Sequence, residues 1–115
     1  RMVMFRCLIQ AGQIDDAQRE KLNGHLTAAA RELCAQFNEP VPITWVEVAE
    51  GFGFTAGKPS RSSVVVSAIP DETPQEDRVV FMKRICDAWS QETGCSINDV
   101  VATAVNVSLA ARAKT

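Results

Sequence analysis

The chain contains the same strand–helix–strand pattern twice, and this repetition limits its fold more than any other feature. Apolar strands end at Ile9 and Ile69, 60 positions apart, and predicted helix caps at Asp15 and Thr73 lie 58 positions apart. Parallel strands joined by a helix need a crossover connection, which is almost always right-handed. We therefore expect an α/β fold of the α+β sandwich type: duplicated β-α-β units forming a four-stranded mixed sheet with two helices on one face.

The first unit, residues 1–57, begins with an apolar strand that we expect to start at the amino terminus and to end at Ile9. Asp15, followed three residues later by Gln18, is typical of a helix N-cap with a capping box. Apolar residues then recur at helical spacing and predict one helix over 16–37; they are Leu22, Leu26, Ala29, Leu33 and Phe37. Pro40 ends that helix, and alternation over 43–48 predicts a second strand.

A glycine-bearing stretch, 50–58, follows as a loop or short hairpin and leads to the second unit, residues 61–107. Residues 63–69 are so rich in valine that we expect a strand covered on both faces. Thr73-Pro74-Gln75-Glu76 predicts a helix start with a threonine cap and a capping box. Gly94 ends the helix, and residues 100–107 supply the fourth strand.

Composition fits a single domain over residues 1–115 and excludes several classes of partner. The chain has 46% hydrophobic and 23% charged residues and a formal net charge of -2, so it has no overall positive field to attract nucleic acid or an anionic membrane. No run approaches the ~20 apolar residues of a membrane span, and no secretory leader is evident. We expect a cytoplasmic protein that binds neither nucleic acid nor membrane.

The four cysteines are spread along the chain and do not form a metal-binding motif. They are Cys7, Cys34, Cys86 and Cys95. Their spacing contains no Cys-x-x-Cys pair, and His25 is the only histidine, so we expect free thiols, no metal site and no cofactor.

The predicted sheet has helices on one face only, so its other face needs a partner. A bare apolar sheet face is unusual in so small a protein. We therefore expect an oligomer in which the sheets of several copies pack against one another.

The order and spacing of these segments resemble those of the tautomerase superfamily along nearly the whole chain. MVMFRCLIQAGQIDDAQREKL is similar to the family's first strand, glycine turn and helix start, and PVPITWVEVAEGFGFTAGKPS to its second strand and glycine loop. PDETPQEDRVVFMKRI resembles the start of the second helix, and DVVATAVNV the last strand. The length favours the cis-3-chloroacrylic acid dehalogenase and malonate semialdehyde decarboxylase branch.

The resemblance implies a homotrimer with an active site in each subunit near the start of the first strand. Members of the family use an amino-terminal proline, whose amine acts as a base or as a cation. This sequence has Arg1 at that position, and it lacks the family's substrate-binding arginines at Gln13, near Trp45 and in Pro70-Asp71-Glu72-Thr73. The resemblance thus implies a member without the central proline.

Arg1 allows three interpretations. Its α-amine is a base if it is free, but a preceding methionine, which we expect in the cell because large second residues block methionine removal, turns that amine into an amide. Its guanidinium carries a fixed charge and five donors suited to a carboxylate, which predicts an anion-binding pocket. Alternatively, Arg1 is a solvated charge or an ion-pair partner between subunits.

Three further residues are candidates for binding a ligand. Trp45 and Phe54 are placed to form the wall of a pocket, since the family's glycine loop contributes apolar residues to a neighbour's site, although packing inside a trimer also accounts for them. Asn106, late in the fourth strand, is a candidate hydrogen-bond donor or a structural amide.

Two functions follow from these residues. The first is a tautomerase-superfamily protein with little or no proton-transfer activity that binds small anionic ligands. The alternative is a weakly active tautomerase, decarboxylase or hydratase acting on small 2-oxo or unsaturated carboxylic acids. The missing proline and arginines favour the first function, and the resemblance itself favours the second.

Overall fold

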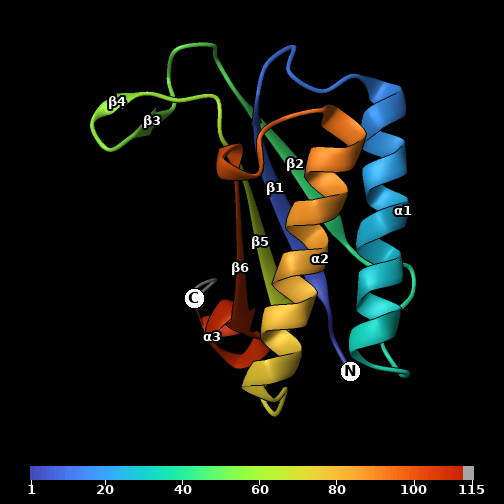
Figure 1. Ribbon diagram of the computed structural model, residues 1–115. Helices are drawn as coiled ribbons and strands as arrows, with labels where there is room; N and C mark the ends of the chain where they lie inside the picture. The colour runs from blue at the N-terminus through green and yellow to red at the C-terminus, as the bar shows by residue number, and fades with distance from the viewer. Residues whose placement is uncertain (113–115) are drawn as a thin grey trace.

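The computed structural model describes residues 1–112 (Figure 1). Its elements in chain order are β1 (Met4–Gln10), α1 (Asp16–Leu33), β2 (Ile43–Val48), β3 (Phe54–Thr55), β4 (Lys58–Pro59), β5 (Ser63–Ile69), α2 (Gln75–Thr93), a 3-10 turn (Ile97–Asp99), β6 (Val100–Asn106) and α3 (Val107–Arg112). Among these residues, no helix is long and apolar enough to cross a membrane.

The main sheet has the strand order β2-β1-β5-β6. β1 and β2 run parallel, as do β5 and β6, while the two central strands, β1 and β5, run antiparallel. Helices α1 and α2 lie side by side on one face of this sheet (Figure 1). The predicted mixed sheet with both helices on one face is therefore confirmed.

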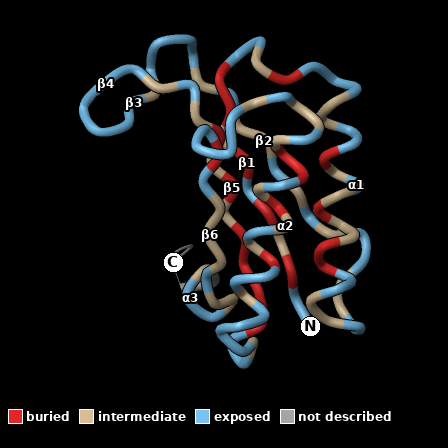
Figure 2. Tube along the Cα trace, viewed as in Figure 1, coloured by how far each residue is buried: buried red, intermediate tan, exposed pale blue. Residues whose placement is uncertain are grey.

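The core lies between the sheet and the two helices, as the buried segments in Figure 2 show. Alternate residues of β1 point into it, among them Phe5, Cys7 and Ile9, as the period of a strand requires. The Phe5 ring stacks on Phe81 of α2 with their centroids 6.0 Å apart. Burial of these side chains holds the helices on the sheet.

The first strand begins later than predicted, at Met4 instead of at the amino terminus. The segment before it is held by Asn38: the Val3 N–H donates to Asn38 Oδ1 at 2.7 Å, and the Asn38 N–H donates to the Arg1 carbonyl at 2.9 Å. Residues 1–3 therefore pair with the loop after α1 instead of extending the sheet. Gln10, expected to lie in the turn, is the last residue of the strand.

The predicted end of the first helix at Phe37 is also wrong, since α1 ends at Leu33 and Cys34 is already extended. The contacts of Asn38 with residues 1 and 3 draw this segment away from the helix axis. At the start of α2 the predicted threonine cap is wrong as well. Pro74 is the N-cap and makes no side-chain cap bond, because the Thr73 hydroxyl donates to the Pro70 carbonyl instead.

Other boundaries match the sequence pattern. Asp15 and Gln18 form the predicted capping box of α1, and Gly94 ends α2 in the left-handed conformation, φ 73°, that glycine adopts without strain. The glycine stretch forms a small hairpin, β3–β4, which extends away from the sheet (Figure 1). The fourth strand ends one residue early, at Asn106, because the short helix α3 begins at Val107.

Candidate functional site

The residue that the sequence singled out, Arg1, lies at the end of the sheet where β1 begins and β5 ends. Asn38 fixes its backbone, as described above. Its guanidinium forms an ion pair with Glu72, which follows β5. The amino-terminal segment is thus tied to two connections of the fold, the loop after α1 and the loop before α2.

An open hollow of about 620 Å³ lies beside Arg1. Its lining comes from residue 1 and from the last turn of α1 with the loop that follows, and comprises Arg1, Arg31, Ala35, Gln36, Phe37 and Glu39. Arg31 Nη2 lies 2.9 Å from Glu39 Oε1. The hollow therefore has two guanidinium groups on its rim, each held by one carboxylate.

Both arginine side chains keep much of their surface in solvent, 51% for Arg1 and 63% for Arg31. Exposed ion pairs of this kind contribute ~0–1 kcal/mol, so a ligand that displaces Glu72 or Glu39 loses little binding free energy. A guanidinium offers a planar set of donors that fits a carboxylate. The chemistry available at this hollow is therefore the binding of small anions.

Asn106 lies at the same end of the sheet, opposite Ile69 of β5. Its Oδ1 accepts a hydrogen bond from Arg78 Nη2, and the same guanidinium donates to the carbonyls of Ala104, Thr73 and Asp71. Arg78 thereby joins the start of α2 to the end of β6. The Asn106 side chain is part of this structural network.

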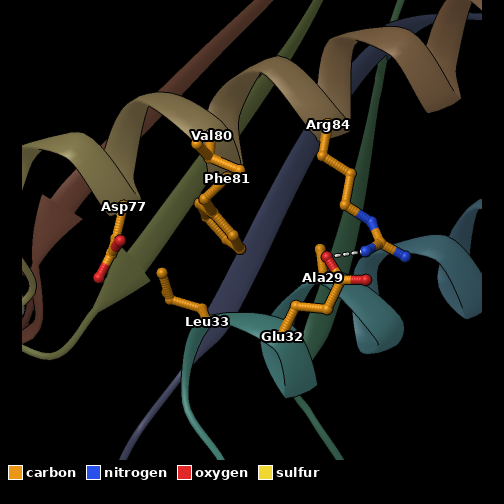
Figure 3. A pocket seen from close by; sticks show the side chains of 7 residues that line it. All are labelled: Ala29, Glu32, Leu33, Asp77, Val80, Phe81 and Arg84. Atoms are coloured by element: carbon orange, nitrogen blue, oxygen red, sulfur yellow. Dashed lines mark ion pairs between the residues drawn. The ribbon is translucent and has the colours of Figure 1, made fainter.

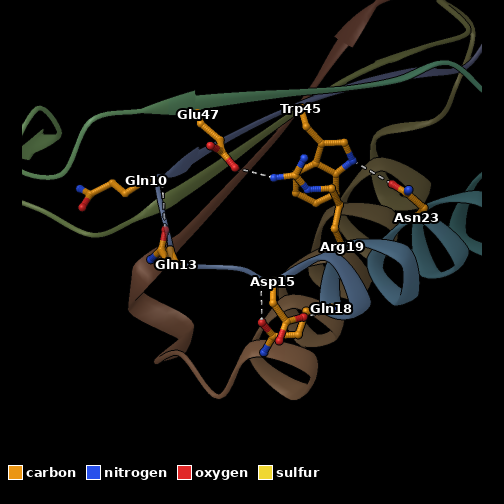
Figure 4. Close-up of polar contacts among 8 residues, drawn as sticks. All are labelled: Gln10, Gln13, Asp15, Gln18, Arg19, Asn23, Trp45 and Glu47. Atoms are coloured by element: carbon orange, nitrogen blue, oxygen red, sulfur yellow. Dashed lines mark hydrogen bonds and ion pairs between the residues drawn. The ribbon is translucent and has the colours of Figure 1, made fainter.

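Trp45 lies on the helix side of β2 (Figure 4). Its Nε1 donates to Asn23 Oδ1 at 2.9 Å. Its ring stacks on the Trp89 ring, with the two centroids 5.5 Å apart. The Arg19 guanidinium lies 5.1 Å from the centre of the Trp45 ring and pairs with Glu47 at 2.7 Å, an arrangement typical of a cation–π contact. Trp45 therefore packs between α1, α2 and the sheet.

Phe54 belongs to the projecting hairpin and is 64% exposed. It lines a separate hollow of about 380 Å³ on the sheet face opposite the helices, with Phe52 and Val101 among the other lining residues. The hairpin base is held by Gln10, whose Nε2 donates to the Ser60 carbonyl. The hairpin base is tight at Gly53, because a Cβ at that position would lie 3.0 Å from Gln10 Nε2 and 3.1 Å from the Ser60 oxygen.

The four predicted site residues thus lie in three places. Arg1 and Asn106 share one end of the sheet, Trp45 lies under the helices, and Phe54 lies on the hairpin at the other end. The sequence analysis missed Arg31 and Phe37, which join Arg1 at its hollow. Arg31, in the last turn of a helix ending earlier than predicted, faces the loop that Asn38 draws toward residue 1. Within residues 1–112, no three His, Cys, Asp or Glu side chains gather into a metal site.

Comparison with solved structures gives the fold. The protein Ps01740 superposes with a TM-score of 0.84 at 24% identity, covering 90% of this chain and 92% of that one. A fused 4-OT symmetric trimer superposes with a TM-score of 0.80 at 17% identity, covering 90% of this chain and 84% of that one. N1, a member of the cis-3-chloroacrylic acid dehalogenase family, superposes with a TM-score of 0.82 at 16% identity, covering 90% of this chain and 73% of that one. The chain has the tautomerase-superfamily fold.

Comparison by sequence adds nothing to this result, since no family model and no curated protein matches the chain. The likeness to the tautomerase fold therefore lies in the superposed backbone, at identities below 25%. Likeness at this level fixes the fold and leaves the chemistry to the site.

Proposed function

We propose that this chain is a tautomerase-superfamily protein that binds small carboxylate anions at Arg1 and has little or no proton-transfer activity. One observation carries the proposal: two partly exposed guanidinium groups, Arg1 and Arg31, border the same hollow at the start of β1. A guanidinium group carries a permanent positive charge. A small dicarboxylate is the ligand best suited to two such groups.

The segment leading into β1 supports the loss of proton transfer. It consists of Arg1, Met2 and Val3 and contains no proline, whatever precedes it. The Val3 nitrogen is a peptide N–H that donates to Asn38 Oδ1, and an amide nitrogen has no basic lone pair. A guanidinium cannot replace the missing base, because it does not lose its proton near neutral pH.

We further propose that the chain assembles as a homotrimer through the sheet face opposite the helices. The side chains on that face are mostly apolar and include Leu8, Val46, Val64, Val66, Val101 and Val105. Arg6 is the one charged side chain on that face of the four strands. The 4-OT structures of the same fold are described as trimers. In such an assembly the hairpin with Phe54 is able to reach a neighbour.

Titration calorimetry with malonate tests the anion site. We expect Arg1→Ala and Arg31→Ala each to weaken binding about tenfold, equivalent to about 1.4 kcal/mol. Arg61→Ala is the matched control, because Arg61 is an exposed arginine at the opposite end of β5, and its affinity should match that of the unchanged protein. Equal affinity in all four proteins would refute the site.

A ketonisation assay separates this proposal from its enzymatic alternative. Phenylenolpyruvate and 2-hydroxymuconate should convert no faster with the protein than in buffer. A rate well above buffer that Arg1→Ala abolishes would instead establish a weakly active enzyme of the same fold. An Arg1→Pro variant with a free amino terminus is the complementary test, since restored activity would show that the base alone is missing.

A further inference from the structure

Two adjacent valines on α2 remain unexplained by the fold or the proposed function. Val79 is 51% exposed and Val80 66%, whereas the next residue, Phe81, is buried at 3%. Valine is a poorer helix former than the straight-chain residues that usually occupy exposed helix positions. Neither the core nor helix propensity accounts for this pair.

Charged residues surround the valines in an ordered way. Glu76 and Asp77 precede them by one turn, and Lys83 and Arg84 follow by one turn. Residues seven apart lie on nearly the same side of a helix, since two turns take 7.2 residues. Glu76 and Lys83 therefore lie in one row along α2, and Asp77 and Arg84 lie in the neighbouring row. Val80 lies between the two rows, near the midpoint of each.

This pattern is complementary to itself. If a second α2 packs antiparallel on the first, about a two-fold axis level with Val80, positions 76 and 83 exchange places, as do 77 and 84. Glu76 then faces Lys83 of the partner subunit, and Asp77 faces Arg84 of the partner subunit. Each contact occurs twice, as in any isologous interface. Moving the two-fold axis by one helical turn, to the level of Glu76 or of Lys83, would place like charges together, so the charges also fix the register.

The acidic half of this surface has no competing partner. Within residues 1–112, no ion pair involves Glu76 or Asp77. Lys83 pairs with Asp87 one turn away at 3.0 Å, and both side chains are mostly exposed. Such an i,i+4 pair contributes only ~0.3–0.5 kcal/mol, so it is easily exchanged for a contact with another copy.

The surface beside Val80 is also hollowed. A groove of about 190 Å³ runs between α1 and α2, with Leu33, Phe81 and Val80 among its lining residues (Figure 3). Arg84 crosses this groove to Glu32 of α1, forming an ion pair between the helices. The groove offers room for an apolar side chain of an opposing helix, as ridge-into-groove packing requires.

We propose that α2 docks antiparallel on α2 of a second copy of this chain, with the valines at the centre and the four charged residues around them. The contact lies on the helix side of the molecule, away from the bare sheet face, so it does not depend on the proposed trimer. Its occupant is another copy because the charges match this sequence's own pattern.

A charge exchange within one pair tests the contact by sedimentation velocity. Glu76→Lys places two lysines opposite each other twice, and we expect self-association through α2 to weaken about tenfold. Adding Lys83→Glu to the same chain restores opposite charges and should restore association. The mixing test uses chains that also carry Val64→Glu, which blocks assembly through the sheet face. The unchanged α2 then meets the exchanged α2 with like charges together, so the two chains should not form mixed dimers. Val80→Glu should abolish the contact.

The outcomes separate this contact from a merely structural role. A folding effect would weaken both single and double variants, whereas recovery in the double variant requires two chains to meet. Circular dichroism should show unchanged helix content in each variant. The proposal is overturned if the unchanged protein and Val80→Glu give particles of equal mass, or if the Val64→Glu chains with and without the charge exchange form mixed dimers.

Discussion

At the scale of single residues, Cys7 shows how burial controls chemistry in this fold. It faces the helices from the middle of β1 and has no exposed surface. Burial raises the pKa of its thiol to about 12, an increase that the nearby Arg19 guanidinium opposes. Burial likewise raises the pKa of Cys86, and Asp87 adds to that rise. The thiolate is the reactive form of cysteine, so we expect burial to slow the reactions of these thiols in the folded protein.

Thiol labelling with mass spectrometry checks this directly. At pH 8 we expect iodoacetamide to modify half-buried Cys34 much faster than Cys7, and unfolding in guanidinium to make the two rates similar. Because the folded pKa of Cys7 lies above the unfolded value of ~8.5, its contribution to stability is present below that pH and is lost as pH rises toward 12. Rapid labelling of Cys7 in the native protein would contradict this.

The candidate residues also show the limit of sequence at this scale. Residue type marks Arg1 as a cation near the start of β1, but it could not reveal that Glu72 of the same chain is its partner. Asn106 suits a ligand by chemistry alone, yet Arg78, 28 residues earlier, takes its side-chain oxygen. Such partners are set by tertiary contacts that no local pattern encodes.

At the scale of elements, α3 makes a polar contact that sequence periodicity does not indicate. Asp71, after β5, accepts a hydrogen bond from the Ser108 N–H at 3.1 Å. The side-chain and backbone hydrogen bonds of Ser108 lower the pKa of Asp71, and Arg78 lowers it further. Asp71 thus anchors the first turn of α3 while it is ionised.

This anchor should respond to acid. Because the pKa of Asp71 is depressed in the folded protein, the anchor's contribution is present above the unfolded value of ~3.9 and is lost as pH falls through the folded one. We expect the Ser108 amide resonance in NMR spectra to shift over that range. Asp71→Asn should remove the transition, and Asp16→Asn, on α1, should leave it unchanged. An identical transition in Asp71→Asn would exclude Asp71 as its source.

The elements themselves follow from the sequence where their signals are local. Alternation located β2 to the residue, the run of valines did the same for β5, and the Asp15–Gln18 pair located the start of α1. The errors arose where distant residues decide a boundary. Asn38 draws the chain out of α1 by bonding to residues 1 and 3, and Asp71 supports the short α3, which is too brief to show helical periodicity.

At the scale of the whole molecule, the two faces of the sheet differ in how they are covered. The helix face buries its side chains within the chain, whereas Val101 on the other face is 46% exposed. Phe52 and Phe54 on the hairpin extend this apolar surface. A continuous apolar surface of this kind is typical of an interface. Assembly through it, which we proposed above, makes a direct prediction.

Val64→Glu should dissociate the trimer, because the new carboxylate would lie on the bare face between Leu8 and Val101, where assembly would bury it. With Val80→Glu added to block the proposed α2 contact, sedimentation equilibrium should then give a single chain of 12.5 kDa. Val64→Ala, which stays apolar, should remain assembled. A trimer of unchanged mass in Val64→Glu would show that subunits do not meet at this face.

The pairing of β1 with β5 has a further consequence. These strands come from different β-α-β units yet form the centre of the sheet. Each unit therefore covers a strand edge of the other that would otherwise be bare. The hairpin turn at Ala56 and Gly57 joins the units and adds nothing to the core. If the polypeptide were cut at that turn, its two fragments would recognise each other. They would then serve as a split-protein pair that reports proximity.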